Sequence, residues 1–218
     1  MKLTKLPLVA ALSLLVLSSN AGAQSTKRLI DEVNPFIGTS NFGTTNPGAV
    51  VPNGLMSITP FNVSGSPELN KFDKDKRWWS TPYTADNKFF SGFSHVNLSG
   101  VGCPELGSII VSASAGDLDV DYTHYGSAMS EEKAHPGYYS VQLDKHKIKA
   151  EVTATQRTAV SAFTFERGGK SNILVNLGLG LTNESGATVR FLNDSTIVGS
   201  KLMGTFCYAP QAVFNQYF

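Results

Sequence analysis

The sequence contains few charged residues and little cysteine. Charged side chains make up 16% of the 218 residues and the formal net charge is +1, so no strong basic field indicates nucleic-acid binding. Two cysteines are too few for a disulfide scaffold or a four-cysteine zinc site. The 20 glycines follow no Gly-X-Y period, which excludes a collagen-like chain. What remains is an ordinary globular composition, with a length that suits one domain or one and a half.

Long hydrophobic runs are also missing, apart from one near the N-terminus. Lys2 and Lys5 precede a largely apolar run at residues 6–17, and three small residues follow at 21–23 (AGA). A helix of this length is too short for the hydrocarbon core of a membrane, which needs about 20 residues. We therefore interpret residues 1–23 as a signal peptide cleaved near Ala23. We expect a secreted or periplasmic protein with no membrane partner.

The mature chain shows no amphipathic helical stripe of three turns. It contains short β-prone runs separated by turn residues, such as 144–145 (DK), 167–169 (RGG) and 184–186 (ESG). Regularly spaced short strands predict an all-β sandwich. We expect a lead-in at residues 24–33 and one β-sandwich domain at residues 34–218. The expected strands are residues 55–61, 89–98, 108–114, 137–143, 148–155, 160–165, 172–177, 188–192, 196–199 and 213–218.

The last expected strand, residues 213–218 (VFNQYF), ends the chain without a cap, a turn or a polar tail. An exposed apolar strand is a liability for a complete domain, because it can pair with other chains. We therefore interpret the domain as incomplete, as in a fragment or after an early stop.

Polar residues form few patterns that indicate chemistry. Asp117, Asp119 and Asp121 alternate, which on one strand face would suit Ca²⁺. The EF-hand ligand set is missing, however, and a solvated strand end is the favoured interpretation. The four histidines have no metal-ligand spacing, and Ser94 beside His95 is not part of a G-x-S-x-G elbow. A core or turn histidine is the default interpretation of His95.

Two features leave alternatives open. Trp78, Trp79 and Tyr83 lie in a polar loop, where aromatic rings either stack on sugar rings or anchor the loop to the core. Cys103 and Cys207 either form a disulfide or remain buried thiols, because the sequence does not give the separation of their Cα atoms.

Several short motifs carry a resemblance to a known family. They are residues 34–39 (NPFIGT), 47–49 (PGA), 52–56 (PNGLM), 92–103 (GFSHVNLSGVGC), 106–107 (LG), 136–139 (PGYY) and 153–158 (TATQRT). In this order and spacing, from about residue 33 to the end, they resemble glycoside hydrolase family 92. The combination of separate motifs is more specific than any one of them.

The resemblance implies part of a secreted, inverting, Ca²⁺-dependent exo-α-mannosidase. In this family an N-terminal β-sandwich precedes an (α/α)₆ barrel, which supplies most of the general acid, general base and calcium ligands. The sequence lacks such a barrel. The active site forms between the two domains, where loops of the sandwich contribute to the pocket for the non-reducing mannose. The implied partners are a mannose-containing glycan and the missing C-terminal catalytic domain.

The same resemblance supplies candidates for the mannose pocket. These substrate-binding residues are Trp79, Trp78, His95, Ser40, Asn41 and Phe42. Many family members have Gly-Gly-His in place of the last three and a second histidine in place of Asn97. These departures affect the expected linkage or extended substrate, and neither removes a known catalytic carboxylate.

The functional expectation is therefore an enzyme fragment without its own activity. An inverting glycosidase needs two carboxylates about 6.5–9.5 Å apart, and nothing pairs the acidic residues of this chain across a pocket. We expect no catalytic residue and no metal site within it. The alternative is a free-standing carbohydrate-binding β-sandwich that uses the aromatic loop, and a third possibility is a structural or adhesion domain.

Overall fold

The protein is described by a computed structural model, which covers residues 28–41, 43–64, 79–100, 102, 104, 106–182, 184–203 and 214–218. The expected signal peptide, Phe42, Trp78 and both cysteines lie outside these residues. The chain divides into two compact units, residues 1–32 and 33–218. In the first unit, the described residues include the short 3-10 helix η1 (Leu29–Glu32). Within the described residues, no helix is long and apolar enough to cross a membrane.

The second unit is built almost entirely from strands, which confirms the all-β prediction. One short helix, α2 (Tyr122–Tyr125), interrupts them. The strands are β1 (Ala49–Val50), β2 (Ser57–Phe61), β3 (Phe89–Phe90), β4 (Gly92–Asn97), β5 (Leu106–Ala115), β6 (Ser127–His135), β7 (Tyr138–Leu143), β8 (Ile148–Ala154), β9 (Ala159–Phe165), β10 (Ser171–Asn176), β11 (Glu184–Asn193), β12 (Thr196–Met203) and β13 (Phe214–Tyr217).

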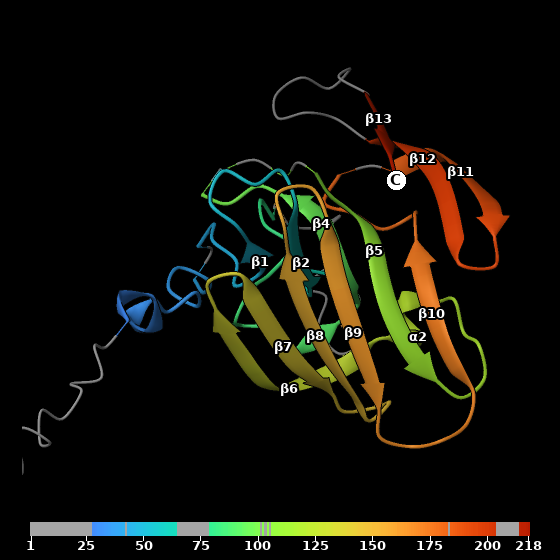
Figure 1. The fold of residues 1–218 in the computed structure, drawn as a ribbon, viewed down its shortest axis with the longest axis horizontal. Helices are drawn as coiled ribbons and strands as arrows, with labels where there is room; N and C mark the ends of the chain where they lie inside the picture. The colour runs from blue at the N-terminus through green and yellow to red at the C-terminus, as the bar shows by residue number, and fades with distance from the viewer. Residues whose placement is uncertain are drawn as a thin grey trace, which may run out of the picture. The chain divides into compact units, whose positions relative to one another are not determined.

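Two five-stranded sheets form the sandwich (Figure 1). The first sheet has the order β1-β2-β4-β5-β10 and the second the order β3-β6-β7-β8-β9, and neighbouring strands in both sheets are antiparallel. Alternate residues of each strand point between the sheets, and burying them is the main favourable term in folding. The core between the sheets contains Ile58, Phe90, Phe93, Ala113, Tyr139, Val141, Leu143, Ile148, Ala150 and Val152 among others.

The outer face of the first sheet carries a second, smaller core. Phe61 and Ile110 lie one strand position out of phase with the inward-facing residues of β2 and β5, so they point to the opposite face. They pack with Val63, Trp79, Leu179 and Leu181, which come from segments after β2, before β3 and after β10. The first sheet is therefore covered on both faces in this region.

A third sheet, in the order β11-β12-β13, adjoins one end of β5. Its contact with the sandwich includes Met203 and Gln216, whose side chains both lie within hydrogen-bond reach of the Ser108 hydroxyl. Farther from that contact, β11 is exposed to solvent at residues 185–193. The third sheet thus has one anchored end and one uncovered end.

Three details differ from the sequence-based expectation. β1 and β6 were not expected as strands. Residues 184–186 were expected to form a turn but lie within β11, where the pairing with β12 shifts register between Ser185 and Thr188. Asp117, Asp119 and Asp121 follow the end of β5 and are not on a strand, so strand alternation does not align their carboxylates.

Candidate functional site

The loop around Ser40 and Asn41 is held close to two other segments. Asn41 adopts a left-handed backbone conformation with φ 51°, which asparagine tolerates better than most residues, and its N–H donates to the Asp86 carboxylate at 3.1 Å. The carbonyl oxygen of Thr39 accepts from the Ala85 N–H at 2.8 Å, and that of Thr44 accepts from the Gly100 N–H at 2.7 Å. The structure therefore brings this loop together with residues 79–88 and with the turn after β4.

Asn62 clamps the middle of the segment 79–88. Its side-chain amide donates to the carbonyl oxygens of Thr84 and Asn87 at 2.8 and 2.7 Å, and its own side-chain oxygen accepts from the Thr84 N–H at 2.8 Å. Asn62 is completely buried, so these bonds satisfy polar groups that have no access to water. The clamp fixes the backbone that connects Trp79 to β3.

Glu132 holds the same segment from the opposite sheet. Its carboxylate accepts from the hydroxyls of Tyr83 and Tyr139, both at 2.8 Å, and pairs with Lys88. Both tyrosines are fully buried, and the Glu132 side chain is 8% exposed. Burial, with a further contribution from Glu132, raises the pKa of both hydroxyls, so they remain donors at neutral pH. Tyr83 is therefore an anchor of the loop and has no exposed ring face for a sugar.

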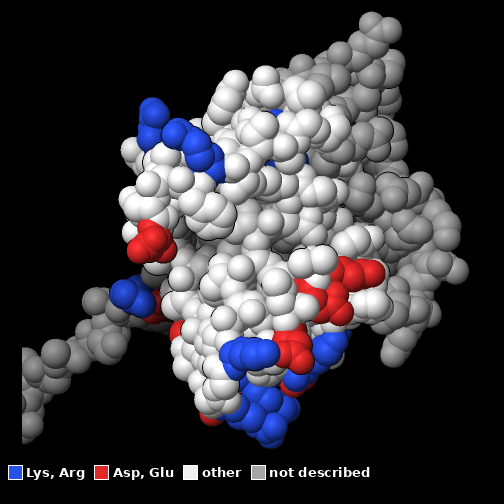
Figure 2. All heavy atoms as spheres, turned by 90° about the vertical axis from the view of Figure 1, so that its right-hand side faces the viewer, with Lys and Arg blue, Asp and Glu red and all other residues white. Residues whose placement is uncertain are grey.

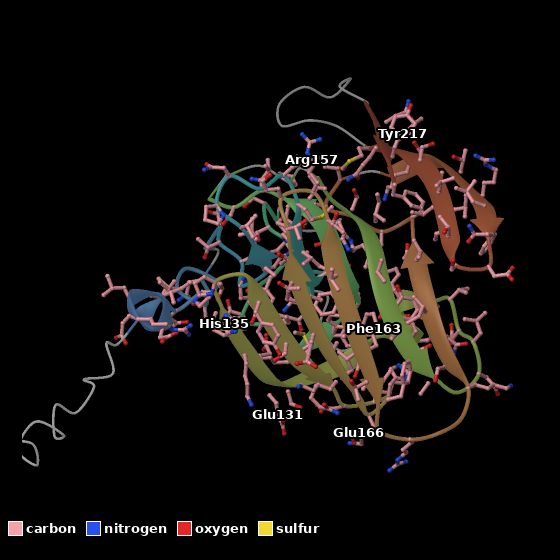
Figure 3. The ribbon with its side chains drawn as sticks, viewed as in Figure 1. Glu131, His135, Arg157, Phe163, Glu166 and Tyr217 are labelled. Atoms are coloured by element: carbon pink, nitrogen blue, oxygen red, sulfur yellow. The ribbon has the colours of Figure 1, made fainter. Side chains whose placement is uncertain are left out.

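A β-bulge points Glu132 into the protein. The β6–β7 pairing shifts register between Ser130 and Lys133, and Glu131 at this place has a positive φ of 50°. A bulge inserts an extra residue into one strand and changes which side chains point inward. As a result Glu131 projects away from the sheets, as Figure 3 shows, while Glu132 reaches the two tyrosines.

Trp79 packs against the core through most of its side chain. It is 7% exposed and belongs to the smaller core, beside Phe61, Val63 and Leu181. The sequence left two roles open for this aromatic loop, stacking on sugar rings and anchoring the loop to the core. The contacts of the described residues support anchoring. A contact between Trp79 and mannose stays a prediction and would involve only the small exposed part of the ring.

His95 occupies a distorted stretch of the first sheet. Its Nδ1 lies 2.7 Å from the carbonyl oxygen of Ile109, which can only accept, so Nδ1 carries the proton and Nε2 of the neutral ring is an acceptor. Burial lowers the pKa of His95, which favours this neutral form. The neighbouring Val96 and Ile109 have φ of 56° and 54°, rare values for β-branched residues. Such strain is often found at functional sites.

Strand alternation separates His95 from Trp79. His95 is the register partner of Ile58 and shares the face of β4 with Phe93, so it lies on the face that points into the sandwich. Trp79 packs against the opposite face, which carries Phe61. His95 and Trp79, both predicted to bind substrate, therefore lie on opposite faces of the first sheet.

The remaining polar candidates have structural partners. Asp121 caps α2 by accepting from the Thr123 N–H at 2.9 Å, and hydrogen bonds from Thr123 lower its pKa. Asp117 pairs with Lys170 on the surface. Among the described residues, no group of three or more His, Cys, Asp or Glu is placed to hold a metal ion.

Sequence reasoning did not identify Asn62 and Glu132 as the residues that hold the loops. Both are ordinary polar residues in the sequence, and their partners lie far along the chain. One signal was present: residues 131–132 (EE) are two consecutive charges, and charged side chains within a strand are typical of a sheet edge.

Comparison with known proteins agrees with this architecture. The sequence profile of the glycosyl hydrolase family 92 N-terminal domain matches residues 32–218. A family GH92 α-mannosidase from Bacteroides thetaiotaomicron shares 30% sequence identity with a TM-score of 0.72, over 81% of this chain and 24% of that chain. Its complex with mannoimidazole gives a TM-score of 0.71 at 30% identity, over 81% of this chain and 23% of that chain.

One curated relative is a secreted glycosidase. An uncharacterized secreted glycosidase from Arthroderma benhamiae is 29% identical over 178 residues, which are 75% of this chain and 21% of the relative. The chain thus spans less than a quarter of the length of these relatives, with shares of 24%, 23% and 21%.

Proposed function

Because the chain belongs to the N-terminal domain family of glycosyl hydrolase family 92, we propose that it is the sugar-facing β-sandwich of a secreted exo-α-mannosidase. The proposed enzyme is inverting and calcium-dependent, acts on α-mannosides of glycans, and is exported after cleavage near Ala23. The observation that carries the proposal is the family match over residues 32–218, supported by a solved α-mannosidase with 30% identity.

In this proposal the chain binds and orients mannose, and the chemistry occurs elsewhere. The pocket residues are Trp79, Trp78, His95, Ser40, Asn41 and Phe42. A neutral His95 offers its Nε2 as an acceptor for a sugar hydroxyl, because Nδ1–H is engaged by Ile109. Asn62 and Glu132 hold the loop segment that carries Trp79. The two carboxylates of an inverting mechanism and the calcium ligands belong to the catalytic domain of the proposed enzyme.

A hydrolysis assay tests the proposal. The purified chain should not hydrolyse aryl α-mannosides with or without Ca²⁺, whereas the chain joined to a family 92 catalytic domain should do so in a Ca²⁺-dependent reaction. Replacement of His95 by Ala in the joined protein should raise KM for the mannoside, while Glu131→Ala serves as a matched exposed control. Hydrolysis by the chain alone that is abolished by one carboxylate substitution within it would overturn the proposal.

A further inference from the structure

A polar hollow lies on the outer face of the second sheet, the face that is toward the viewer in Figure 1. It has a volume of about 210 Å³ and is lined by residues of β6, β7 and β8. Tyr138, Ser140 and Gln142 alternate along β7 with the core residues Tyr139 and Val141, so their side chains point outward into this lining. The volume is several times the ~30 Å³ of one water molecule, so the hollow has room for a small ligand.

Ser140 lies at the centre of the hollow, between its register partners Lys133 on β6 and Glu151 on β8. Ser140 is only 3% exposed. Among the described residues, neither its hydroxyl nor the ammonium group of Lys133 has a hydrogen-bond or ion-pair partner. Native proteins rarely leave a buried polar group unpaired, because its lost hydration is not replaced. The Ser140 hydroxyl therefore indicates a partner that enters the hollow.

Hydrogen bonds fix two of the polar side chains around Ser140. The side-chain amide of Gln142 donates to the Glu166 carboxylate at 2.8 Å, which leaves the Gln142 Oε1 as an acceptor. The Lys149 ammonium group pairs with Glu151 at 2.9 Å. Side chains that are already held in place lose less conformational freedom when a ligand binds.

An aromatic ring borders the same hollow. The Tyr138 ring is stacked on the His135 ring, with centroids 4.8 Å apart and planes 12° apart, and its hydroxyl donates to Glu151. Figure 3 labels His135 near the start of β7. Tyrosine combines an apolar ring with a polar tip, so Tyr138 adds an apolar wall to a site that is otherwise polar.

The charges around the hollow nearly cancel. Lys133 and Lys149 are offset by Glu151 and by Glu131, which projects away from the sheets at the rim. Opposite charges at one place do not produce the field that would select an anion such as phosphate. Val141 also lines the hollow, but its side chain belongs to the core. The side of the molecule with β10 and β11 differs, because Figure 2 shows a broad uncharged area there.

We propose that this hollow binds one neutral sugar unit, a hexopyranoside. Ser140 and Lys133 donate to its hydroxyl groups, the Gln142 Oε1 accepts from one, and the Tyr138 ring contacts its C–H face. A sugar suits this lining because it carries donors, acceptors and apolar C–H groups without a net charge. The inference goes beyond the proposed function, since none of these residues belongs to the proposed mannose pocket.

Titration of the chain with sugars, followed by NMR of the backbone amides, tests the inference. Methyl α-mannoside, methyl α-glucoside and inorganic phosphate are added separately. We expect at least one of the glycosides, and not phosphate, to shift the amides of residues 133, 140 and 142. A glycoside without effect on all three amides identifies no ligand, and failure of both glycosides overturns the inference.

Two variants test the contacts. Ser140→Ala should weaken glycoside binding roughly two- to tenfold, because one hydrogen bond is lost. The urea midpoint of this variant should not fall, since the hydroxyl has no partner among the described residues. Lys133→Ala should weaken binding at least about threefold. Arg190→Ala is the matched control, because it removes an exposed cation on β11, and it should bind like the parent chain.

The other outcomes contradict the inference. Shifts of the hollow with phosphate alone would assign it to an anion. A lower urea midpoint for Ser140→Ala with unchanged glycoside affinity would mean that the hydroxyl binds only an ordered water. Glycoside shifts confined to residues 40–41 and 95–97 would support the proposed mannose pocket and exclude the hollow. Hydrolysis by the joined protein is measured separately, so its failure contradicts the proposed function and leaves the hollow in place.

Discussion

The loop segment 79–88 and the surface at β10 and β11 represent two opposite situations in one domain. The segment lies outside any long strand, yet its polar groups are paired with Asn62 and Glu132 and its aromatic side chains are buried. The β10–β11 surface is built from regular strands, yet it leaves Ile173, Val189 and Phe191 exposed. Regular secondary structure is therefore not enough to stabilise a region by itself. A region is stable when its polar groups are hydrogen-bonded and its apolar groups are buried.

Removing the largest aromatic side chain of the segment should have the largest effect. Trp79→Ala leaves a cavity against Phe61 and Val63, and we expect a loss of roughly 3–5 kcal/mol in the free energy of unfolding, measured with urea. Phe191→Ala, on the exposed surface, is the control and should change this free energy by less than about 0.5 kcal/mol. Equal losses for the two variants would show that the contrast between the regions is wrong.

Breaking the polar anchor should have a somewhat smaller effect. Glu132→Ala leaves the buried hydroxyls of Tyr83 and Tyr139 without their acceptor, and we expect a loss of roughly 2–4 kcal/mol. Glu131→Ala removes the neighbouring exposed carboxylate and should be nearly neutral. If Glu132→Ala is as stable as Glu131→Ala, the hydrogen bonds that Glu132 accepts contribute little to the free energy of unfolding. Hydrogen exchange at residues 83–88 should rise in Glu132→Ala and not in the control.

Acid should weaken the region around His95 by a smaller amount. Burial lowers the pKa of His95, so the unfolded chain takes up this proton before the folded chain does. Stability is therefore complete above the unfolded pKa of about 6.5 and falls as the pH drops below it toward the lower folded pKa. Urea unfolding across this range should show the loss in the parent chain and a reduced loss in His95→Gln. The exposed His124, replaced in the same way, provides the control.

The smallest effect on stability is expected at the exposed aliphatic side chains beside β10. Val120→Asp changes a side chain that is already 74% exposed, so the free energy of unfolding should change by less than about 0.5 kcal/mol. Its solubility should nevertheless improve, because a charge interrupts an exposed apolar patch. Light scattering of concentrated samples measures this. A large destabilisation would mean that the Val120 side chain contributes to the core.

The sequence predicted strands best where hydrophobic alternation and β-branched residues agree. Residues 148–155 and 108–114 correspond to β8 and β5 for this reason. β6 was missed because its sequence, SAMSEEKAH, contains helix-favouring residues and because the bulge at Glu131 breaks the alternation. The prediction of a turn at residues 184–186 was wrong, because Gly186, with φ 56°, lies at the irregularity in the β11–β12 pairing. A glycine signals a positive φ but does not distinguish a bulge from a turn.

The candidate site was predictable only in outline. The polar aromatic loop and the turn at Ser40 were recognisable from the sequence, and hydrogen bonds do connect these segments. The burial of Trp79 was not predictable, because Leu179 and Leu181 cover it from a distant part of the chain. The opposite-face arrangement of His95 and Trp79 also depends on strand register, which the sequence does not fix where bulges occur. The sugar contacts of these residues remain predictions.

Hydrogen exchange of the chain tests the central contrast most directly. Amides of residues 83–88 should exchange slowly, and those of β10 and β11 should exchange quickly because their surface is uncovered. Exchange at β10 and β11 that is as slow as exchange at residues 83–88 would contradict the account.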